Sequence, residues 1–342
     1  MQTPVLFGHT ASGEAVHLFT LTDTQSRMSA ELIEYGATVR SIVLHTENGA
    51  LDVAAGYDTL AEYERGSCYF GAAVGRFGNR LGGARFCAGG EEYRVFANER
   101  GNCLHGGAKG FSHVVWRGEQ TADNCVRFCY TSPDGEECFP GKMEVCITYT
   151  LQNSALHIAY EATTDKACPV SLTNHSYFNL AGEGNILGHL LTIHADRYTE
   201  VDAQLIPTGA LPPVAGTPFD FTAAKPVGQD IAADHPQIAV GSGYDHNFCL
   251  TGEGMRLAAE LACKENGVSM QLYTDRPALQ LYAGGAMPTH KGKAGSMHTL
   301  NSSLALETQG YPDAPNHAHF PACILRPNEV WRSETAYHFC FQ

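Results

Sequence analysis

The chain has 342 residues, enough to bury a substantial core, and a formal net charge of −14. Lys and Arg are sparse and form no cluster, so neither nucleic acid nor an anionic membrane surface is expected as a partner. No apolar run is long enough to span a bilayer, and the N-terminal stretch lacks the pattern of a signal peptide, so a cytoplasmic protein is expected.

The 12 cysteines are expected to be free thiols in a reducing compartment. Many lie in runs typical of strands, such as Cys129 in "VRFCY" and Cys146 in "MEVCITYTL", where cysteine serves as a small apolar side chain. No Cys-x-x-Cys pair occurs, so a zinc or redox site built on thiols is not expected.

Residues 59–66, "TLAEYERG", carry the best helix signal, with Thr59 as the expected N-cap. Further along, four segments alternate with period two and predict strands. They are "VRFCYTS", "MEVCITYTL", "ALHIAYEATT" and "VSMQLYTD". Asp134-Gly135 and Asn266-Gly267 indicate hairpin connections. This density of strands favours an all-β sandwich formed by residues 1–342 as one domain, although the pattern is also compatible with two domains.

Two glycine-rich segments in the first third of the chain carry candidate binding residues. "VGRFGNRLGGARF" lacks the spacing of a phosphate-binding loop, and what remains is Asn79-Arg80 on a tight turn. The five donors of Arg80 suit a hydroxyl-rich or anionic ligand, but an arginine that ties the loop backbone together is the alternative. In "NCLHGG", two glycines follow His105 and allow the chain to present its ring, as a functional or a structural histidine.

Residues 171–180, "SLTNHSYFNL", begin with strand-like alternation and then concentrate polar groups beside two aromatic residues. This combination is typical of a strand that enters a polar pocket. From the residues alone, His175 is a general acid, a metal ligand or a buried structural histidine.

Two carboxylates complete the candidates. Asp245 in "GYDHNFCL" can accept two adjacent sugar hydroxyls, or can cap a turn. Glu307 ends the apolar run Leu304–Leu306, where burial without a partner raises a carboxyl pKa and suits a general base. The alternative for Glu307 is an internal salt bridge, for example to Arg80.

A metal site is not expected, although the chain has 16 histidines. His317-x-His319 would place two rings on one face of a strand. No His-Glu-x-x-His motif, no histidine pair with a carboxylate at ligand spacing and no thiol partner accompanies it.

Seven motifs, taken in order, resemble those of the aldose 1-epimerase, or galactose mutarotase, family over nearly the whole chain. They are "GRFGNRLGG", "NCLHGG", "TNHSYFNL", "VDAQLIPTG", "GYDHNF", "PALQLYAGG" and "LALETQGYPDAPNH". The resemblance implies a single-domain, antiparallel β-supersandwich with few short helices. It also implies an isomerase of hexose metabolism that interconverts the α and β anomers of free aldohexoses such as D-galactose and D-glucose without a cofactor, as a monomer or homodimer.

The resemblance assigns the general acid to His175 and the general base to Glu307. It assigns substrate binding to Asn79, Arg80, His105, Tyr177, Asp245 and Gln280. The sequence departs from the family pattern at Gly78, at Ser176 and in "YAGG" at residues 282–285, all at the expected pocket edges. None of these departures removes the acid or the base.

The chemistry explains the residue types. Opening a hemiacetal ring requires one group to take the proton of the C1 hydroxyl and another to protonate the ring oxygen, which a carboxylate and a histidine do near neutral pH. Two alternatives remain: a non-catalytic sugar-binding or regulatory protein on the same fold, and a phosphosugar 1-epimerase. The first does not explain the acid and base pair, and the second needs a cationic phosphate site.

Overall fold

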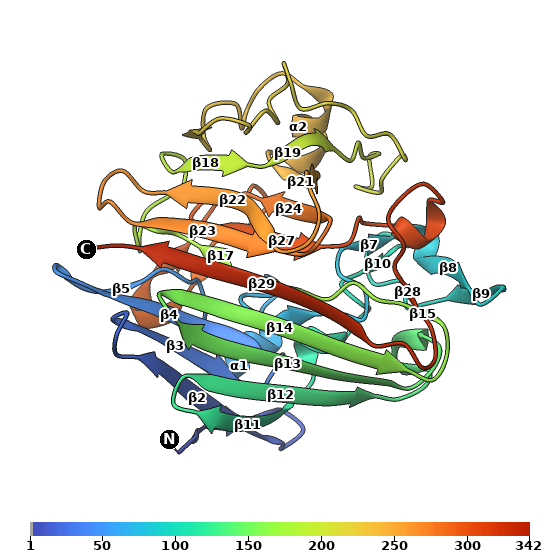
Figure 1. Cartoon of the computed structure of the whole chain (residues 1–342), viewed down its shortest axis with the longest axis horizontal. Coiled ribbons are helices and arrows are strands. Elements are labelled where there is room, and N and C mark those ends of the chain that lie inside the picture. The colour runs from blue at the N-terminus through green and yellow to red at the C-terminus, as the bar shows by residue number, and fades with distance from the viewer. Residues whose placement is uncertain (1–2) are drawn as a thin grey trace.

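The structure is a computed structural model that describes residues 3–342, and antiparallel sheets dominate it (Figure 1). The all-β prediction is confirmed: the described residues contain only two α-helices, α1 (Leu60–Arg65) and α2 (Pro236–Gly241). Neither helix has the length or apolarity required to cross a bilayer.

The largest sheet has nine strands and forms one layer of the sandwich (Figure 1). Its long central strands pair in register over eight to ten residues, which explains the strong period-two signal of their sequences. In spatial order the strands are β11 (Arg117–Ala122), β12 (Cys125–Ser132), β13 (Met143–Gln152), β14 (Ala155–Thr164), β29 (Trp331–Cys340), β23 (Ser269–Thr274), β22 (Arg256–Ala262), β18 (Leu190–Ile193) and β20 (Lys225–Pro226).

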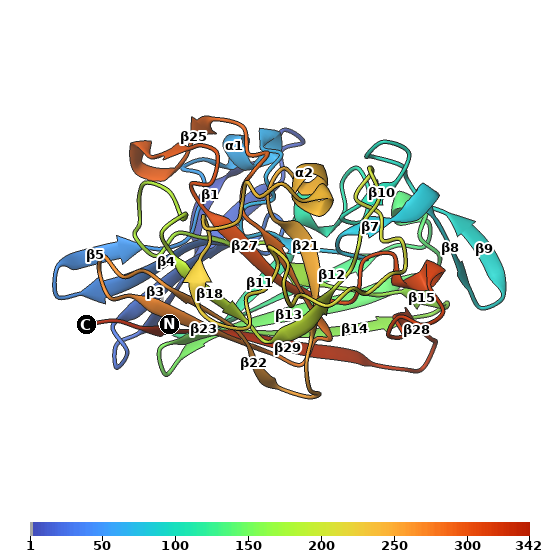
Figure 2. The same cartoon turned by 90° about the horizontal axis from the view of Figure 1, so that it is seen from above.

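Two five-stranded sheets pack on the inner face of the nine-stranded sheet, and Figure 2 shows α1 and α2 on their far side. The first consists of β1 (Val5–His9), β2 (Ala15–Asp23), β3 (Met28–Ile33), β4 (Thr38–Thr46) and β5 (Gly49–Asp52). The second, called the site sheet below, consists of β17 (Tyr177–Phe178), β27 (Leu304–Gln309), β24 (Ala278–Tyr282), β21 (Asp245–Leu250) and β19 (Ala195–Tyr198).

Buried side chains join these layers. Phe19 of β2 meets Phe128 of β12 edge to face at 5.3 Å, a favourable aromatic geometry. The Tyr337 hydroxyl of β29 donates a hydrogen bond to the Leu306 carbonyl of the site sheet at 3.3 Å. The site sheet is therefore anchored to the centre of the nine-stranded sheet.

Short elements complete the described fold. The remaining strands are β6 (Ala73–Val74), β7 (Arg80–Leu81), β8 (Arg85–Ala88), β9 (Glu91–Arg94), β10 (Cys103–Leu104), β15 (Cys168–Pro169), β16 (Thr173–Asn174), β25 (His290–Lys291), β26 (Met297–His298) and β28 (Ile324–Leu325). Single turns of 3₁₀ helix span Gly82–Ala84, Phe111–His113, Glu136–Cys138, Lys293–Gly295 and Ala314–Asn316.

The predicted N-cap at Thr59 and the two predicted connections between strands are present in the structure. Thr59 is the N-cap of α1, and its backbone N–H donates to the Glu62 carboxylate at 2.9 Å. A short turn containing Gly267 at φ 72° connects β22 to β23. Gly135, at φ 83°, lies in the longer connection between β12 and β13.

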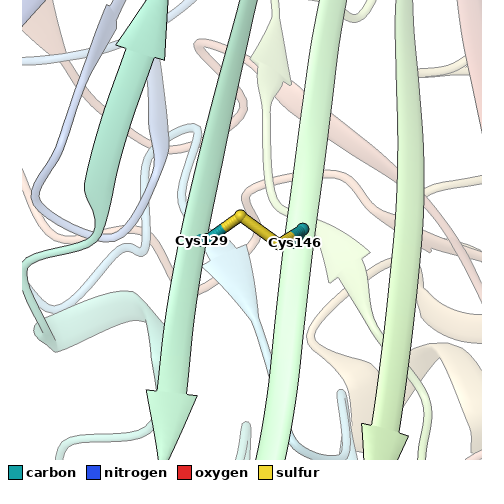
Figure 3. Close-up of a disulfide and its surroundings, with 2 residues drawn as sticks. All are labelled: Cys129 and Cys146. Carbon is teal, nitrogen blue, oxygen red and sulfur yellow. A yellow bond between two sulfur atoms is a disulfide. The ribbon is translucent and has the colours of Figure 1, made fainter.

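The expectation that all cysteines are free is wrong for one pair. Cys129 and Cys146 occupy directly paired positions on β12 and β13 and form a disulfide, with their Cα atoms 4.2 Å apart (Figure 3). Their neighbours Phe128 and Ile147 are buried in the core, so by alternation the disulfide lies on the outer face of the nine-stranded sheet. The other ten cysteines are free.

Removing this disulfide should lower stability without lowering activity. In Cys146→Ser, the lost cross-link should cost at most about 3 kcal/mol, because β12 and β13 remain paired along their length. Urea unfolding measures the cost. The predicted activity, described below, should be unchanged because the site sheet lies against the opposite face. A folded Cys146→Ser variant with strongly reduced kcat would contradict this expectation.

Candidate active site

One face of the site sheet gathers four of the predicted site residues. Directly paired residues on antiparallel strands share a face, and Glu307 pairs with Gln280 while Tyr177 pairs with Ala305. Asp245 pairs with Tyr282, two residues from Gln280, and therefore lies on the same face. The opposite face carries core residues, namely Leu304, Leu306, Leu279, Leu281 and Phe248. The register therefore places the polar candidate residues on one face of the site sheet and apolar core residues on the other.

His175 lies in the link between β16 and β17, beside Glu307. Its backbone N–H donates to the Ala72 carbonyl at 2.9 Å, and its carbonyl accepts from the Gly71 N–H at 3.0 Å. Its Nε2 is 3.4 Å from Glu307 Oε1, and both side chains are almost fully buried. The Nδ1 atom of His175 and the Oε2 atom of Glu307 have no hydrogen-bond partner among the described residues.

Two adjacent loops bring Asn79 and His105 to this pair. Strands β7 and β10 pair with each other, and Asn79 and His105 flank that short ladder. The Asn79 backbone N–H donates to His105 Nδ1 at 3.1 Å, so the proton of the neutral ring lies on Nε2. Gly106 is required here, because a Cβ at this position would lie 1.9 Å from the Gly75 carbonyl oxygen.

Arg80 is held by two carboxylates, and neither is Glu307. Its guanidinium donates to Glu99 through Nε at 2.8 Å and Nη2 at 2.9 Å, and its Nη1 lies 4.0 Å from Asp245 Oδ2. Gln280 Nε2 donates to Asp245 Oδ1 at 2.6 Å. Asp245 therefore faces the site and does not cap a turn.

Burial favours the uncharged forms of both members of the His175–Glu307 pair. Burial lowers the pKa of His175 to about 4. Burial, assisted by the charge of Asp245, raises the pKa of Glu307 well above its usual value of 4.5, and Arg80 opposes this shift. Both shifts favour a pair that holds one proton, on Glu307, and transfer to His175 crosses only the contact between Oε1 and Nε2.

The surrounding groups are shifted as well. Burial, followed by the neighbouring His175 and Arg80, lowers the pKa of His105 well below 6.5, so its ring is neutral. Burial raises the pKa of Asp245, although Arg80 and Gln280 oppose it. Burial opposes the charge of Arg80, but its hydrogen bonds with Glu99 and the charge of Asp245 raise its pKa overall.

Two contacts of the site were not anticipated from the sequence. Glu99, the main partner of Arg80, lies in an irregular loop without a motif. Tyr69, which has a left-handed backbone with φ 56°, packs against both His105 and His175, and its local sequence does not indicate either feature. Both partnerships join segments distant in sequence, so local pattern could not reveal them.

Other expectations need correction or detail. His317 and His319 do not lie on a strand: they follow a 3₁₀ turn, and His317 Nε2 is 3.3 Å from Asp313. In the departing segment "YAGG", Gly285 permits a close approach, since a Cβ there would lie 1.9 Å from the Ser242 carbonyl oxygen.

Comparisons with known proteins agree with this geometry. The aldose 1-epimerase family model matches residues 17–338. The chain belongs to the aldose 1-epimerase family. A galactose mutarotase from Mus musculus is 41% identical over 343 residues, covering 98% of both chains. An aldose 1-epimerase from Escherichia coli is 36% identical over 345 residues, covering 99% of this chain and 98% of the relative.

Solved structures of the aldose 1-epimerase family share the fold. An aldose epimerase homologue from C. elegans superimposes with a TM-score of 0.88 at 29% identity, covering 96% of this chain and 99% of that one. A galactose 1-epimerase from Lactobacillus acidophilus gives a TM-score of 0.87 at 28% identity, covering 99% and 98%.

One group in this aldose 1-epimerase family member has the composition of a metal site. Single ligand atoms of His105, His175 and Glu307 lie within 4.8 Å of one another. However, the Asn79 N–H occupies the lone pair of His105 Nδ1, so Nε2 carries the proton and has no lone pair for a metal. The group therefore does not fit a three-ligand site without loss of that hydrogen bond.

Zinc should consequently not bind at these three residues. In calorimetric titrations with Zn²⁺, the wild type and Glu307→Gln should give the same binding curve, because any zinc taken up by the ten free cysteines is common to both. A binding step present in the wild type and absent from Glu307→Gln would contradict the tautomer assigned to His105.

Proposed function

We propose that the protein is an aldose 1-epimerase that interconverts the α and β anomers of free aldohexoses such as D-galactose and D-glucose. The observation that carries the proposal is the buried His175–Glu307 pair, in which an imidazole nitrogen and a carboxylate oxygen lie 3.4 Å apart. The C1 hydroxyl and the ring oxygen of an aldose are attached to the same carbon, so an acid and a base that act on them must be neighbours.

In the proposed reaction, the Glu307 carboxylate takes the proton from the C1 hydroxyl while the His175 imidazolium protonates the ring oxygen. The bond between C1 and the ring oxygen breaks, and the C1 carbonyl forms. Rotation about C1–C2 presents the other carbonyl face, the ring closes, and both protons return. The pair reaches its reactive charged form by moving its single proton from Glu307 to His175, so no external proton is consumed.

The other predicted residues act on the sugar oxygens in this proposal. The His105 Nε2–H and the Arg80 guanidinium stabilise negative charge as it develops on oxygen. Asp245, with Gln280, accepts hydrogen bonds from sugar hydroxyls. Asn79 and Tyr177 complete the binding residues: Asn79 fixes the His105 tautomer, and the Tyr177 ring stacks on His175 at 4.9 Å.

An unphosphorylated substrate is supported by the charges around the site. Arg80 donates hydrogen bonds to Glu99 through Nε and Nη2, and its Nη1 lies 4.0 Å from the Asp245 carboxylate. Arg80 is therefore not free to hold a phosphate. We propose that residues 1–342 act as one domain, in the cytoplasm, without metal or another cofactor. The continuous core from β2 to β29 supports the first point. Ten free cysteines support the second, whereas the Cys129–Cys146 disulfide does not.

Polarimetry with freshly dissolved sugars tests the function. The protein should accelerate the mutarotation of α-galactose, α-glucose or both, with EDTA present throughout, and should leave glucose 6-phosphate at its spontaneous rate. Acceleration restricted to glucose 6-phosphate would favour a phosphosugar epimerase, and no acceleration of any sugar would favour a binding protein. Activity lost in EDTA and restored by a divalent ion would contradict the cofactor-free mechanism.

The acid and base should each be required for turnover. Glu307→Gln keeps the shape of the side chain but removes the base, and His175→Asn removes the acid. Each should lower kcat by about 10²–10⁴-fold. The double variant should lose little more than either single variant, because both groups act in one ring-opening step. A folded Glu307→Gln variant that retains wild-type kcat would place the base elsewhere.

The pH profile of kcat/KM should report the one-proton pair. The His175 pKa is lowered to about 4, so kcat/KM should fall as the pH drops toward that value and the pair gains a second proton. The Glu307 pKa is raised, so kcat/KM should fall again on the alkaline side, where the pair loses its proton. A rate that keeps rising toward acid pH would contradict this assignment.

A further inference from the structure

The His175 ring lacks the hydrogen bond that commonly orients a catalytic imidazole. In many active sites the second ring nitrogen donates to a carboxylate or carbonyl, which sets the direction of the first. Here Nδ1 is buried and has no hydrogen-bond partner among the described residues, although Nε2 faces Glu307. No other described residue therefore fixes the plane of the ring through a hydrogen bond to Nδ1, and the packing contacts of the ring become important.

Two tyrosine rings lie nearly parallel to the imidazole. Tyr177 stacks at a centroid distance of 4.9 Å with 19° between the planes, and Tyr69 stacks at 5.8 Å with 21°. Such parallel contacts restrict rotation of the imidazole about its χ2 torsion, because a turned ring would collide with its neighbours. Tyr177 is itself fixed, since it pairs with Ala305 in the site sheet.

Tyr69 reaches this position through an unusual backbone. Its φ of 56° is left-handed, which is disfavoured for a large side chain and indicates a constraint imposed by its surroundings. The Ala72 N–H donates to the Tyr69 carbonyl at 3.0 Å and closes a turn over residues 69–72. The same turn bonds to both backbone groups of His175, through Gly71 and Ala72. The turn and the histidine therefore form one hydrogen-bonded unit.

The ring of Tyr69 also touches the second histidine of the site. It meets His105 edge to face at 4.7 Å, and on a further side it meets His113 at 5.7 Å. The Tyr69 side chain thus contacts both His175, the proposed acid, and His105, the proposed hydrogen-bond donor. Its hydroxyl is not needed for these contacts, because they are made by the ring.

We propose that Tyr69 is a positioning residue that holds the His175 imidazole in line with Glu307 and the reacting oxygens. This inference rests on the proposed function. The positioning is assigned to the aromatic ring of Tyr69. This role accounts for a bulky residue at a left-handed position that glycine would occupy without strain.

The decisive variant is Tyr69→Gly, with Tyr69→Phe as its matched control. Glycine accepts a φ of 56°, so the turn should persist and the variant should fold, although loss of the packed ring should lower its thermal stability. If the ring positions His175, kcat should fall about 10–10²-fold, because small misplacements of a reacting group are costly. Tyr69→Phe retains the ring and should keep kcat near the wild-type value. Tyr93→Leu, which removes a ring that stacks on Phe86 in the β8–β9 hairpin, should leave kcat unchanged.

The pH profile separates positioning from a purely structural role. Loss of the ring exposes His175 to water, which raises its pKa toward the normal value and should move the acid limb of kcat/KM toward neutral pH. Apart from Tyr69 itself, the charged and titratable groups around His175, which are Glu307, His105, Arg80 and Tyr177, are unchanged in the variant. A purely structural role would lower the folded fraction without moving this limb.

The outcomes are distinct. A folded Tyr69→Gly with wild-type kcat and an unmoved acid limb overturns the proposal. If Tyr69→Gly does not fold, Tyr69→Leu, which fills more of the space, takes its place under the same criteria. An active wild type with an impaired, folded variant supports the positioning role. A wild type inactive on every aldose overturns the proposed function, and the role of Tyr69 with it.

Discussion

Glu307 and His175 are buried side by side, with exposed side-chain fractions of 2% and 6%. Burial alone penalises both charges, so the pair is stable in a form that carries one proton and no net charge. The 3.4 Å distance between His175 Nε2 and Glu307 Oε1 allows the charged form to be reached by one short proton transfer. Most other features of the site can be understood as means of holding these two groups together in a dry environment.

The sheet register and the loops divide this task. Alternation along β27 turns Leu306 toward the core and Glu307 toward the candidate site, so a shift by one residue would exchange the proposed base for an apolar side chain. His175 comes from a link between strands, and backbone hydrogen bonds to residues 71 and 72 fix it. Arg80 is neutralised by Glu99 and Asp245, which limits its effect on the pKa of Glu307.

Much of this arrangement could be predicted from the sequence. Period-two patterns identified the long strands, and the polar residues that interrupt strand ends, such as Glu307 after Leu304–Leu306, marked the site. The pairing of strands far apart in the chain could not be predicted, since alternation defines faces but not neighbours. The partnership of Arg80 with the loop residue Glu99 was missed for a similar reason. The disulfide between Cys129 and Cys146 was missed although β12 and β13 are consecutive, because the cysteines were expected to be thiols in a reducing compartment. The left-handed backbone of Tyr69 has no local sequence signature.

The most direct test of the one-proton pair is the protonation state of Glu307 itself. An infrared difference spectrum between the wild type and Glu307→Gln, recorded at neutral pH without sugar, isolates the vibrations of this carboxyl group. Because burial raises its pKa well above the usual value, the spectrum should contain the C=O stretch of a protonated carboxylic acid. The paired stretches of an ionised carboxylate in its place would contradict the account of how this acid and base are prepared.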